Sequence, residues 1–142
     1  MNVKELRIGN CVNFKNRTDI RYCTVEELTS RGGCYITRYF YHSELEDDSD
    51  SQIEAIEDLT PITLTSEILL NNGWGEISNE SQFRNFRLVP GIYISLSKKD
   101  DKNIGSLKGD FVISDDYHII KYVHRLQNYL YEVYNYEWNP NL

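Results

Sequence analysis

Five polar side chains near the C-terminus have the types and the spacing that suit binding or acid–base chemistry. His124, Asn128 and Tyr131 are four and three residues apart, which places them on one face of a helix, and Arg125 and Gln127 flank them. Histidine and tyrosine can exchange protons, whereas asparagine and glutamine amides can pair with another amide or with a nucleobase edge. We therefore take these five residues as the candidate binding site. The pattern also fits a structural role, in which His124 is solvated or hydrogen-bonded within the fold.

A helix over residues 119–136 is needed to position this face. Its apolar residues recur at steps of three and four and form one stripe: Ile119, Ile120, Val123, Leu126, Leu130, Val133 and Tyr134. We expect Asp115 or Asp116 to cap the N–H groups of the first turn. Asn135 and the following Pro140 are expected to end the helix. The stripe predicts that the helix packs on a core.

Signatures of the common enzyme classes are missing from the sequence. It holds no P-loop, no dinucleotide-binding glycine pattern, no nucleophile elbow and no H-E-x-x-H motif. A nucleophile formed by one of the three cysteines (Cys11, Cys23 and Cys34) with His42 or His124 stays open, although strand cysteines are usually buried and inert. No CxxC pair occurs, and the histidines lack the spacing of zinc ligands. We predict free thiols, no metal, no cofactor and no enzymatic activity.

The acidity of the chain is confined to one segment. Its net charge is −7, yet residues 1–41 hold seven basic against four acidic side chains. Residues 42–60 hold eight acidic side chains and no basic one. We expect an acidic loop over residues 44–58 that rejoins a sheet near residues 53–56. Asp47, Asp48 and Asp50 are candidates for an acidic surface that holds a cation or imitates phosphates, although the ligand order of a calcium loop is absent.

The rest of the pattern predicts an α+β fold in a single domain of two lobes, a size that 142 residues fit. In the lobe of residues 1–60, three short strands and tight turns indicate a small SH3-like barrel or a curled antiparallel sheet (residues 11–15, 20–28 and 34–41). The lobe of residues 61–142 begins with a short helix that Thr65 caps and Gly73 ends. An antiparallel β-meander follows (residues 82–89, 92–97 and about 108–114), and the long C-terminal helix covers it.

Three motifs occur in a characteristic order along the chain. They are ELRIGN at residues 5–10, PITLTSEILLNNGW at residues 61–74 and YVHRLQN at residues 122–128. In these motifs the chain resembles a family of small uncharacterised proteins of phages and prophages of Bacteroidota, which start with an ELRIGN-type segment and end with a YVHxLQN-type helix. After the last motif the chain departs from the family pattern, because YLYEVYNYEW is more aromatic. The resemblance implies a phage or prophage origin and no particular activity.

Three classes of function follow from these observations. The first is a non-catalytic phage or prophage accessory protein that binds a host or phage protein through the last helix, for example as an antagonist of host defence. The phage part is implied by the resemblance alone. The second is a small-ligand protein that stacks a nucleotide or signalling molecule on its aromatic residues. The third is a small barrel that binds single-stranded nucleic acid through basic residues of the first lobe, namely Lys4, Arg7, Lys15, Arg17 and Arg21.

Charge and hydropathy exclude other classes. The overall negative charge opposes binding to duplex nucleic acid, because phosphate contacts need lysine and arginine. No apolar stretch is long enough for a membrane span or a signal peptide, so we expect no membrane association and a cytoplasmic protein, in the host cell if it is phage-encoded. The tyrosine-rich edge beyond Leu130 favours a homodimer.

Overall fold

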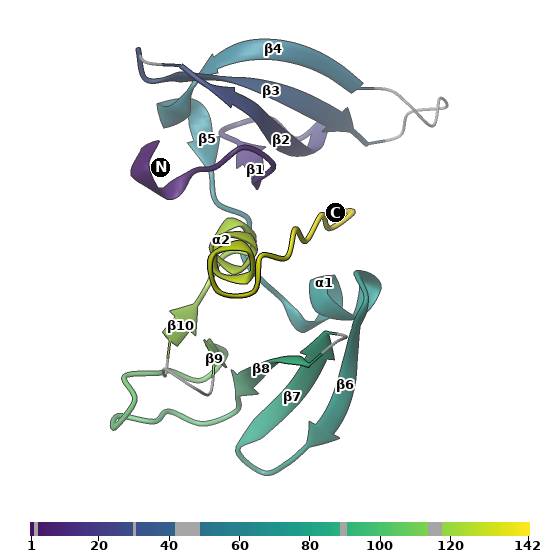
Figure 1. The fold of residues 1–142 in the computed structure, drawn as a ribbon, viewed down its shortest axis with the longest axis vertical. Helices are drawn as coiled ribbons and strands as arrows, with labels where there is room; N and C mark the ends of the chain where they lie inside the picture. Colours follow the sequence, from purple (N-terminus) through teal and green to yellow (C-terminus); the bar gives the residue numbers. More distant parts are fainter. Residues whose placement is uncertain (2, 30, 42–48, 89–90, 114–117) are drawn as a thin grey trace. The chain divides into compact units, whose positions relative to one another are not determined.

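Two compact units make up the chain in the computed structural model (Figure 1). The structure describes residues 1, 3–29, 31–41, 49–88, 91–113 and 118–142. The first unit comprises residues 1–62 with 122–140 and 142, and the second comprises residues 63–121 with 141. Each unit has an antiparallel sheet and an α-helix, which confirms the α+β class. The sequence-based division groups the last helix with the second lobe, whereas the structure groups its residues with the first unit.

The first unit is built on a curled five-stranded sheet in the order β4-β3-β2-β1-β5. Its strands are β1 (Cys11–Phe14), β2 (Ile20–Leu28), β3 (Gly33–Phe40), β4 (Ser49–Ala55) and β5 (Leu59–Thr60), and 3-10 turns occur at η1 (Val3–Glu5) and η2 (Ile56–Asp58). Strand β1 pairs with β2 on one side and with β5 on the other, so the sheet rolls back along its first strand. Two register shifts in β2 add local twist. The prediction of a curled antiparallel sheet is confirmed.

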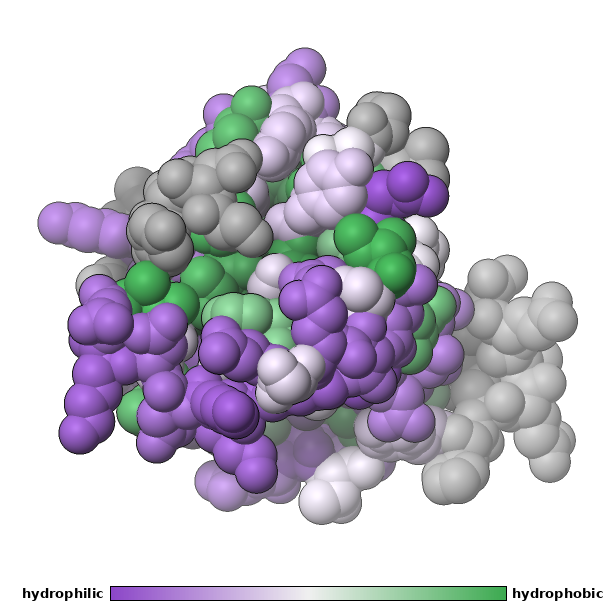
Figure 2. Space-filling view, turned by 90° about the horizontal axis from the view of Figure 1, so that it is seen from below, coloured by the Kyte–Doolittle hydropathy of each residue, from purple (hydrophilic) through white to green (hydrophobic). Residues whose placement is uncertain are grey.

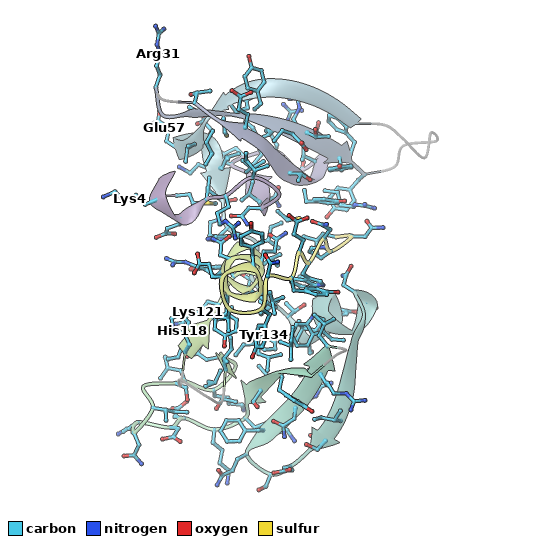
Figure 3. The ribbon with its side chains drawn as sticks, viewed as in Figure 1. Lys4, Arg31, Glu57, His118, Lys121 and Tyr134 are labelled. Carbon is cyan, nitrogen blue, oxygen red and sulfur yellow. The ribbon has the colours of Figure 1, made fainter. Side chains whose placement is uncertain are left out.

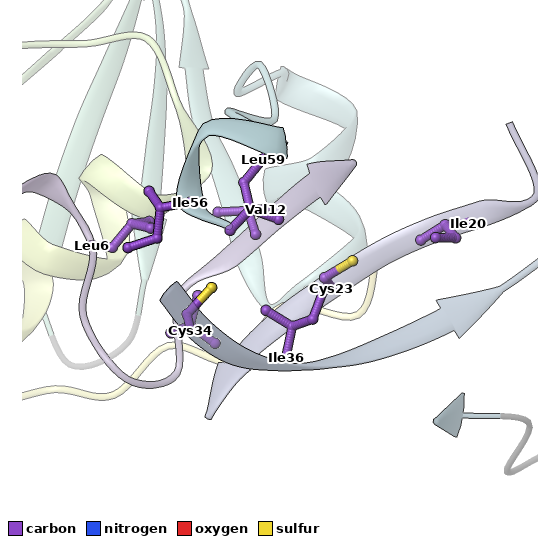
Figure 4. Packing of buried hydrophobic residues seen from close by; sticks show 9 residues of the cluster. Leu6, Val12, Ile20, Cys23, Cys34, Ile36, Ile56 and Leu59 are labelled. Atoms are coloured by element: carbon purple, nitrogen blue, oxygen red, sulfur yellow. The ribbon is translucent and has the colours of Figure 1, made fainter. Parts of the chain in front are cut away.

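The concave side of this sheet holds a small apolar core (Figure 4). Its nine buried residues are Leu6, Val12, Ile20, Cys23, Val25, Cys34, Ile36, Ile56 and Leu59. Alternating positions of β3, such as Cys34 and Ile36, point to the same face because side chains alternate along a strand. All three cysteines are free and buried, as the sequence predicts.

Strand β4 begins at Ser49, so the predicted acidic loop over residues 44–58 is wrong for residues 49–52, whereas the predicted return to the sheet near residues 53–56 agrees with the end of β4. Strand β4 pairs with β3 along its whole length, from Ser49 opposite Tyr39 to Ala55 opposite Gly33. A polar, charged sequence is compatible with this position, because β4 lies at the edge of the sheet where charges discourage further pairing. Asp50 lies in β4, and Asp47 and Asp48 lie outside the described residues.

The second unit has a five-stranded sheet in the order β10-β9-β8-β7-β6. Its strands are β6 (Trp74–Asn79), β7 (Phe83–Leu88), β8 (Ile92–Ser97), β9 (Phe111–Ile113) and β10 (His118–Ile120). The predicted meander corresponds to β7, β8 and β9, whereas β6 and β10 were not predicted. Helix α1 (Ser66–Asn71) begins as predicted, because the Thr65 hydroxyl accepts a hydrogen bond from the Ile68 amide. In the view of Figure 2, hydrophilic residues cover much of the visible surface, with hydrophobic residues showing between them.

Helix α2 (Val123–Tyr134) of the first unit is shorter than the predicted 119–136. Ile119 and Ile120 lie instead in β10, where Ile119 pairs with Val112. Two adjacent β-branched residues fit a strand as well as a helix stripe, so periodicity alone could not separate them. The residue before α2 is Tyr122 rather than an aspartate, so the predicted cap is wrong. Asp115 and Asp116 lie outside the described residues. None of the helices in the described part of the chain is long and apolar enough to span a membrane.

Asn135 ends α2, as the sequence predicts. Its backbone is left-handed, with φ 52° and ψ 39°, and its N–H bonds to carbonyls of the last turn. We expect Asn135→Ala to lower the free energy of unfolding by about 1 kcal/mol, because alanine lacks the short polar side chain with which asparagine tolerates the left-handed conformation. Asn135→Gly should match the parent within about 0.5 kcal/mol, since glycine adopts it freely. Urea unfolding of both variants checks this, and equal losses would contradict the left-handed cap.

Candidate functional site

Gln127 holds three backbone segments of the first unit together. Its side-chain oxygen accepts a hydrogen bond from the Cys11 amide at 2.8 Å. Its side-chain nitrogen donates to the carbonyl of Gly9 at 2.9 Å and to that of Trp138 at 3.0 Å. The side chain is nearly buried, with 6% of its residue surface exposed. Gln127 therefore serves to join α2 to residues 9–11 and to the C-terminal segment, and it is not accessible to a partner.

Asn128 makes a second set of contacts with the N-terminal segment. Its nitrogen donates to the carbonyl of Glu5 at 2.8 Å, and its oxygen accepts from the Asn10 side chain at 2.9 Å. Asn10 in turn accepts a hydrogen bond from the Arg7 amide at 2.8 Å. The turn between them uses Gly9, whose φ of +86° suits glycine. The ELRIGN and YVHRLQN motifs thus bind each other, about 118 residues apart in the chain.

His124 is fully buried between these motifs. Neither ring nitrogen has a hydrogen-bond partner among the described residues, and Nε2 lies 3.9 Å from a carboxylate oxygen of Glu5. The ring stacks on Tyr122, with 5.8 Å between ring centroids. Burial, assisted by the charge of Arg125, lowers the pKa of His124 to about 4, and Glu5 opposes this shift. His124 is therefore a neutral core residue near neutral pH.

Arg125 keeps the acidic partner of His124 in place. Its guanidinium lies 2.9 Å from the second carboxylate oxygen of Glu5. Both side chains are partly exposed, so we regard this ion pair as a weak contribution to stability. The contact fixes Arg125 along η1 and leaves half of its side chain at the surface.

The environment of Cys11 does not suit a nucleophile. Its polar contacts are the Gln127 side chain at 3.6 Å and the Pro140 carbonyl at 4.0 Å. Burial raises the pKa of the Cys11 thiol to about 11, although the Gln127 contact opposes the shift. The thiol is therefore protonated at neutral pH, whereas nucleophilic cysteines need a lowered pKa. His42, the other predicted histidine partner, lies outside the described residues.

A cavity of about 160 Å³ lies at the outer end of these contacts. It is lined by residues 7–10, by Gln127, Asn128 and Tyr131 of α2, and by residues 137–139. The guanidinium carbon of Arg7 lies 3.6 Å from the centroid of the Tyr131 ring, a cation–π contact at the mouth of the cavity. Tyr131 is 39% exposed and the neighbouring Ile8 is 67% exposed. Tyr131 is thus a predicted site residue that both lines this cavity and keeps exposed surface.

The structure therefore divides the five candidate residues into two groups. His124 and Gln127 are buried, and Asn128 is engaged on both ends of its amide. Arg125 and Tyr131 keep exposed surface. Glu5, Asn10 and Trp138 belong to the site but were not predicted. The ELRIGN motif was the signal that could have revealed the first two.

The basic residues of the nucleic-acid hypothesis are spread over separate contacts. Arg17 forms an ion pair with Asp19 at 2.6 Å, which lowers the pKa of Asp19 to about 2. The Lys15 ammonium donates to the carbonyl of Glu57. Lys4 extends from η1 (Figure 3), and Arg7 lies on Tyr131. Two of these cations are thus already paired with acceptors of the same unit, which weakens their attraction for phosphates. Within the described ranges, no group of three or more acidic, histidine or cysteine side chains is arranged for a metal ion.

No family model matches the chain, and neither does a curated protein or a solved structure.

Proposed function

We propose that the protein is a non-catalytic binding protein that engages a protein partner through one edge of its first unit. This edge consists of Arg7, Ile8, Tyr131 and Tyr134, and we call it the Arg7–Tyr131 edge. The observation that carries the proposal is the stacking of the Arg7 guanidinium on Tyr131 beside an isoleucine that is 67% exposed. Tyrosine and arginine are the residues that most often dominate binding energy at interfaces.

Gln127 and Asn128 of the polar face of α2 hold the Arg7–Tyr131 edge in place. Gln127 and Asn128 hold residues 5–10 against α2, so Arg7 and Ile8 are presented on a segment with fixed hydrogen bonds. Tyr134 comes from the last turn of α2 (Figure 3), and its ring meets that of Tyr129 edge-on, with 6.0 Å between centroids. A pre-organised edge loses little conformational entropy on binding. The buried polar residues of α2 thus support the edge, and the exposed edge makes the contact with the partner.

The wider assignment rests on the resemblance of the ELRIGN and YVHRLQN motifs. On that basis we propose a phage or prophage accessory protein of the host cytoplasm, whose partner is a host or phage protein such as a component of host defence. We also propose that the curled sheet of the first unit is an SH3-like barrel and that the protein forms a homodimer. Size-exclusion chromatography with light scattering tests the dimer directly.

Affinity capture from host lysate tests the protein-binding proposal. The edge variant carries Ile8→Ser and Tyr131→Ser, which remove apolar and aromatic contact area from exposed positions. The matched control carries Ile77→Ser and Tyr93→Ser, which are 48% and 49% exposed in the second unit. We expect parent and control to retain the same partner, and the edge variant to retain at least about tenfold less, as for a hot spot of 1.4 kcal/mol or more. Equal capture by both variants would overturn the proposal.

A second candidate is a small-ligand binding protein, which the cavity beside Arg7 supports. Its volume of about 160 Å³ is smaller than a typical drug-sized site, so a chemical group rather than a whole nucleotide fits it.

A further inference from the structure

The Arg7 guanidinium is the main hydrogen-bond donor of the cavity that has no acceptor among the described residues. Among the described residues its side chain has the Tyr131 ring as partner and no carboxylate or carbonyl acceptor. Stacking uses the face of the guanidinium plane and leaves the N–H groups at its edge available. A guanidinium in this state is suited to a planar acceptor that takes two parallel hydrogen bonds.

Three of the amides that line the cavity, those of Gln127, Asn10 and Asn128, are occupied by contacts within the protein, whereas the exposed Asn139 adds a fourth. Gln127 bonds to Cys11, Gly9 and Trp138. Asn10 and Asn128 bond to each other and to backbone groups. The walls are thus fixed, and they offer an incoming group fewer free donors than Arg7 does. Recognition of a ligand in this cavity therefore depends mainly on the positive charge of Arg7.

The charges of the lining restrict the ligand further. Arg7 is the one cation among the lining residues, and Glu137 adds a carboxylate. Arg7 and Glu137 together leave the lining without net charge, so every negative charge of a ligand is opposed by Glu137, and a dianion such as phosphate is opposed more strongly than a monoanion that pairs with Arg7. The lining therefore favours a monoanion with two coplanar oxygens.

We propose that this cavity binds a carboxylate group that the partner presents to Arg7, with Ile8 in contact with the apolar carbons that carry it. This inference rests on the proposed function and names the chemistry of the partner. Two consequences follow from the charges. Removing the Arg7 charge weakens binding, and removing the Glu137 charge strengthens it.

A titration followed by fluorine NMR tests the inference without any partner. The protein has two tryptophans, and Trp138 lines the cavity whereas Trp74 belongs to the second unit, so 5-fluorotryptophan gives one reporter and one internal control. The probes are N-acetylglutamic acid α-amide, its neutral counterpart N-acetylglutamine amide, N-acetylleucine and inorganic phosphate. N-acetylleucine carries a chain-terminal carboxylate, so it separates that source from an acidic side chain.

We expect one of the two carboxylate probes to shift the Trp138 signal in a saturable manner at millimolar concentration and leave the Trp74 signal unchanged. Arg7→Gln should weaken binding at least about tenfold, Arg7→Lys less, and Glu137→Gln should tighten it about twofold or more. The control Arg31→Gln removes an exposed charge elsewhere in the first unit and should have no effect. Equal binding of the neutral amide, tighter binding of phosphate, or a dissociation constant unaltered by Arg7→Gln would overturn the inference.

The result is independent of the capture experiment. Capture of a partner through the Arg7–Tyr131 edge without carboxylate binding refutes the carboxylate site and leaves the protein-binding proposal intact. Saturable carboxylate binding without a captured partner supports the site and contradicts the protein-binding proposal.

Discussion

Replacing Gln127 by leucine is expected to lower the free energy of unfolding of the first unit by about 3 kcal/mol. Leucine has a similar volume, so the cost comes from polar groups rather than from a cavity. The substitution leaves the Cys11 amide and the carbonyls of Gly9 and Trp138 without their partner. Each buried group that loses its hydrogen bond costs about 1–3 kcal/mol, with carbonyls at the lower end because a second lone pair can relax toward another donor.

Urea unfolding of protein labelled with 5-fluorotryptophan measures this effect in each unit. Trp138 reports the first unit and Trp74 the second. We expect the transition of the Trp138 signal to move to lower urea in Gln127→Leu. Gln82→Leu is the matched control, because Gln82 is exposed and lies in the second unit. An unchanged Trp138 midpoint would show that the three hydrogen bonds contribute nothing net to stability.

Local sequence signals were sufficient to predict the elements whose ends are marked by turn or cap residues. Strand β2 has the predicted bounds, because its β-branched and aromatic residues are flanked by polar turns. The Thr65 cap and the left-handed Asn135 were predicted from single side chains. Strand β6 was missed because it is mostly exposed and polar, and β4 was predicted only near residues 53–56 because the residues before them are acidic and polar. Their residues are held in the sheet by backbone pairing with β7 and β3, which leaves little trace in hydropathy.

In the candidate site, too, features set by neighbouring residues were predicted, and features set by residues distant in the sequence were not. The spacing of His124, Asn128 and Tyr131 identified one face of α2, but spacing does not reveal what covers a face. Gln127 is buried because its acceptors and donors come from residues about 118 positions earlier in the chain and 11 positions later. Polar residues at such spacing are typical of a solvated helix face, and they also occur where a helix makes buried hydrogen bonds to distant segments of the chain. The contact between the two motifs explains their joint occurrence without requiring a ligand for each polar residue.

Acidification should destabilise the first unit through His124. Its pKa is 6.5 in the reference state and about 4 in the fold, because burial penalises the charged ring. The unfolded chain therefore binds more protons than the folded chain between these two values, and stability rises with pH across that window. The contribution is complete above pH 6.5 and is lost as the pH falls toward 4. The shift corresponds to at most about 3 kcal/mol.

Comparing the pH dependence of the free energy of unfolding of the parent with that of His124→Leu isolates the contribution of His124, because the carboxylates titrate in both proteins. The free energy of unfolding of the parent should fall more steeply between pH 6.5 and 4.5 than that of the variant. His118→Leu removes an exposed histidine of the second unit and should keep the parental slope. The groups that face His124 are Glu5 and Arg125, so Glu5→Gln should steepen the fall by removing the one charge that favours the imidazolium. Parallel curves for parent and His124→Leu would mean that the ring is hydrated or ionised in the native protein, contrary to its burial between the two motifs.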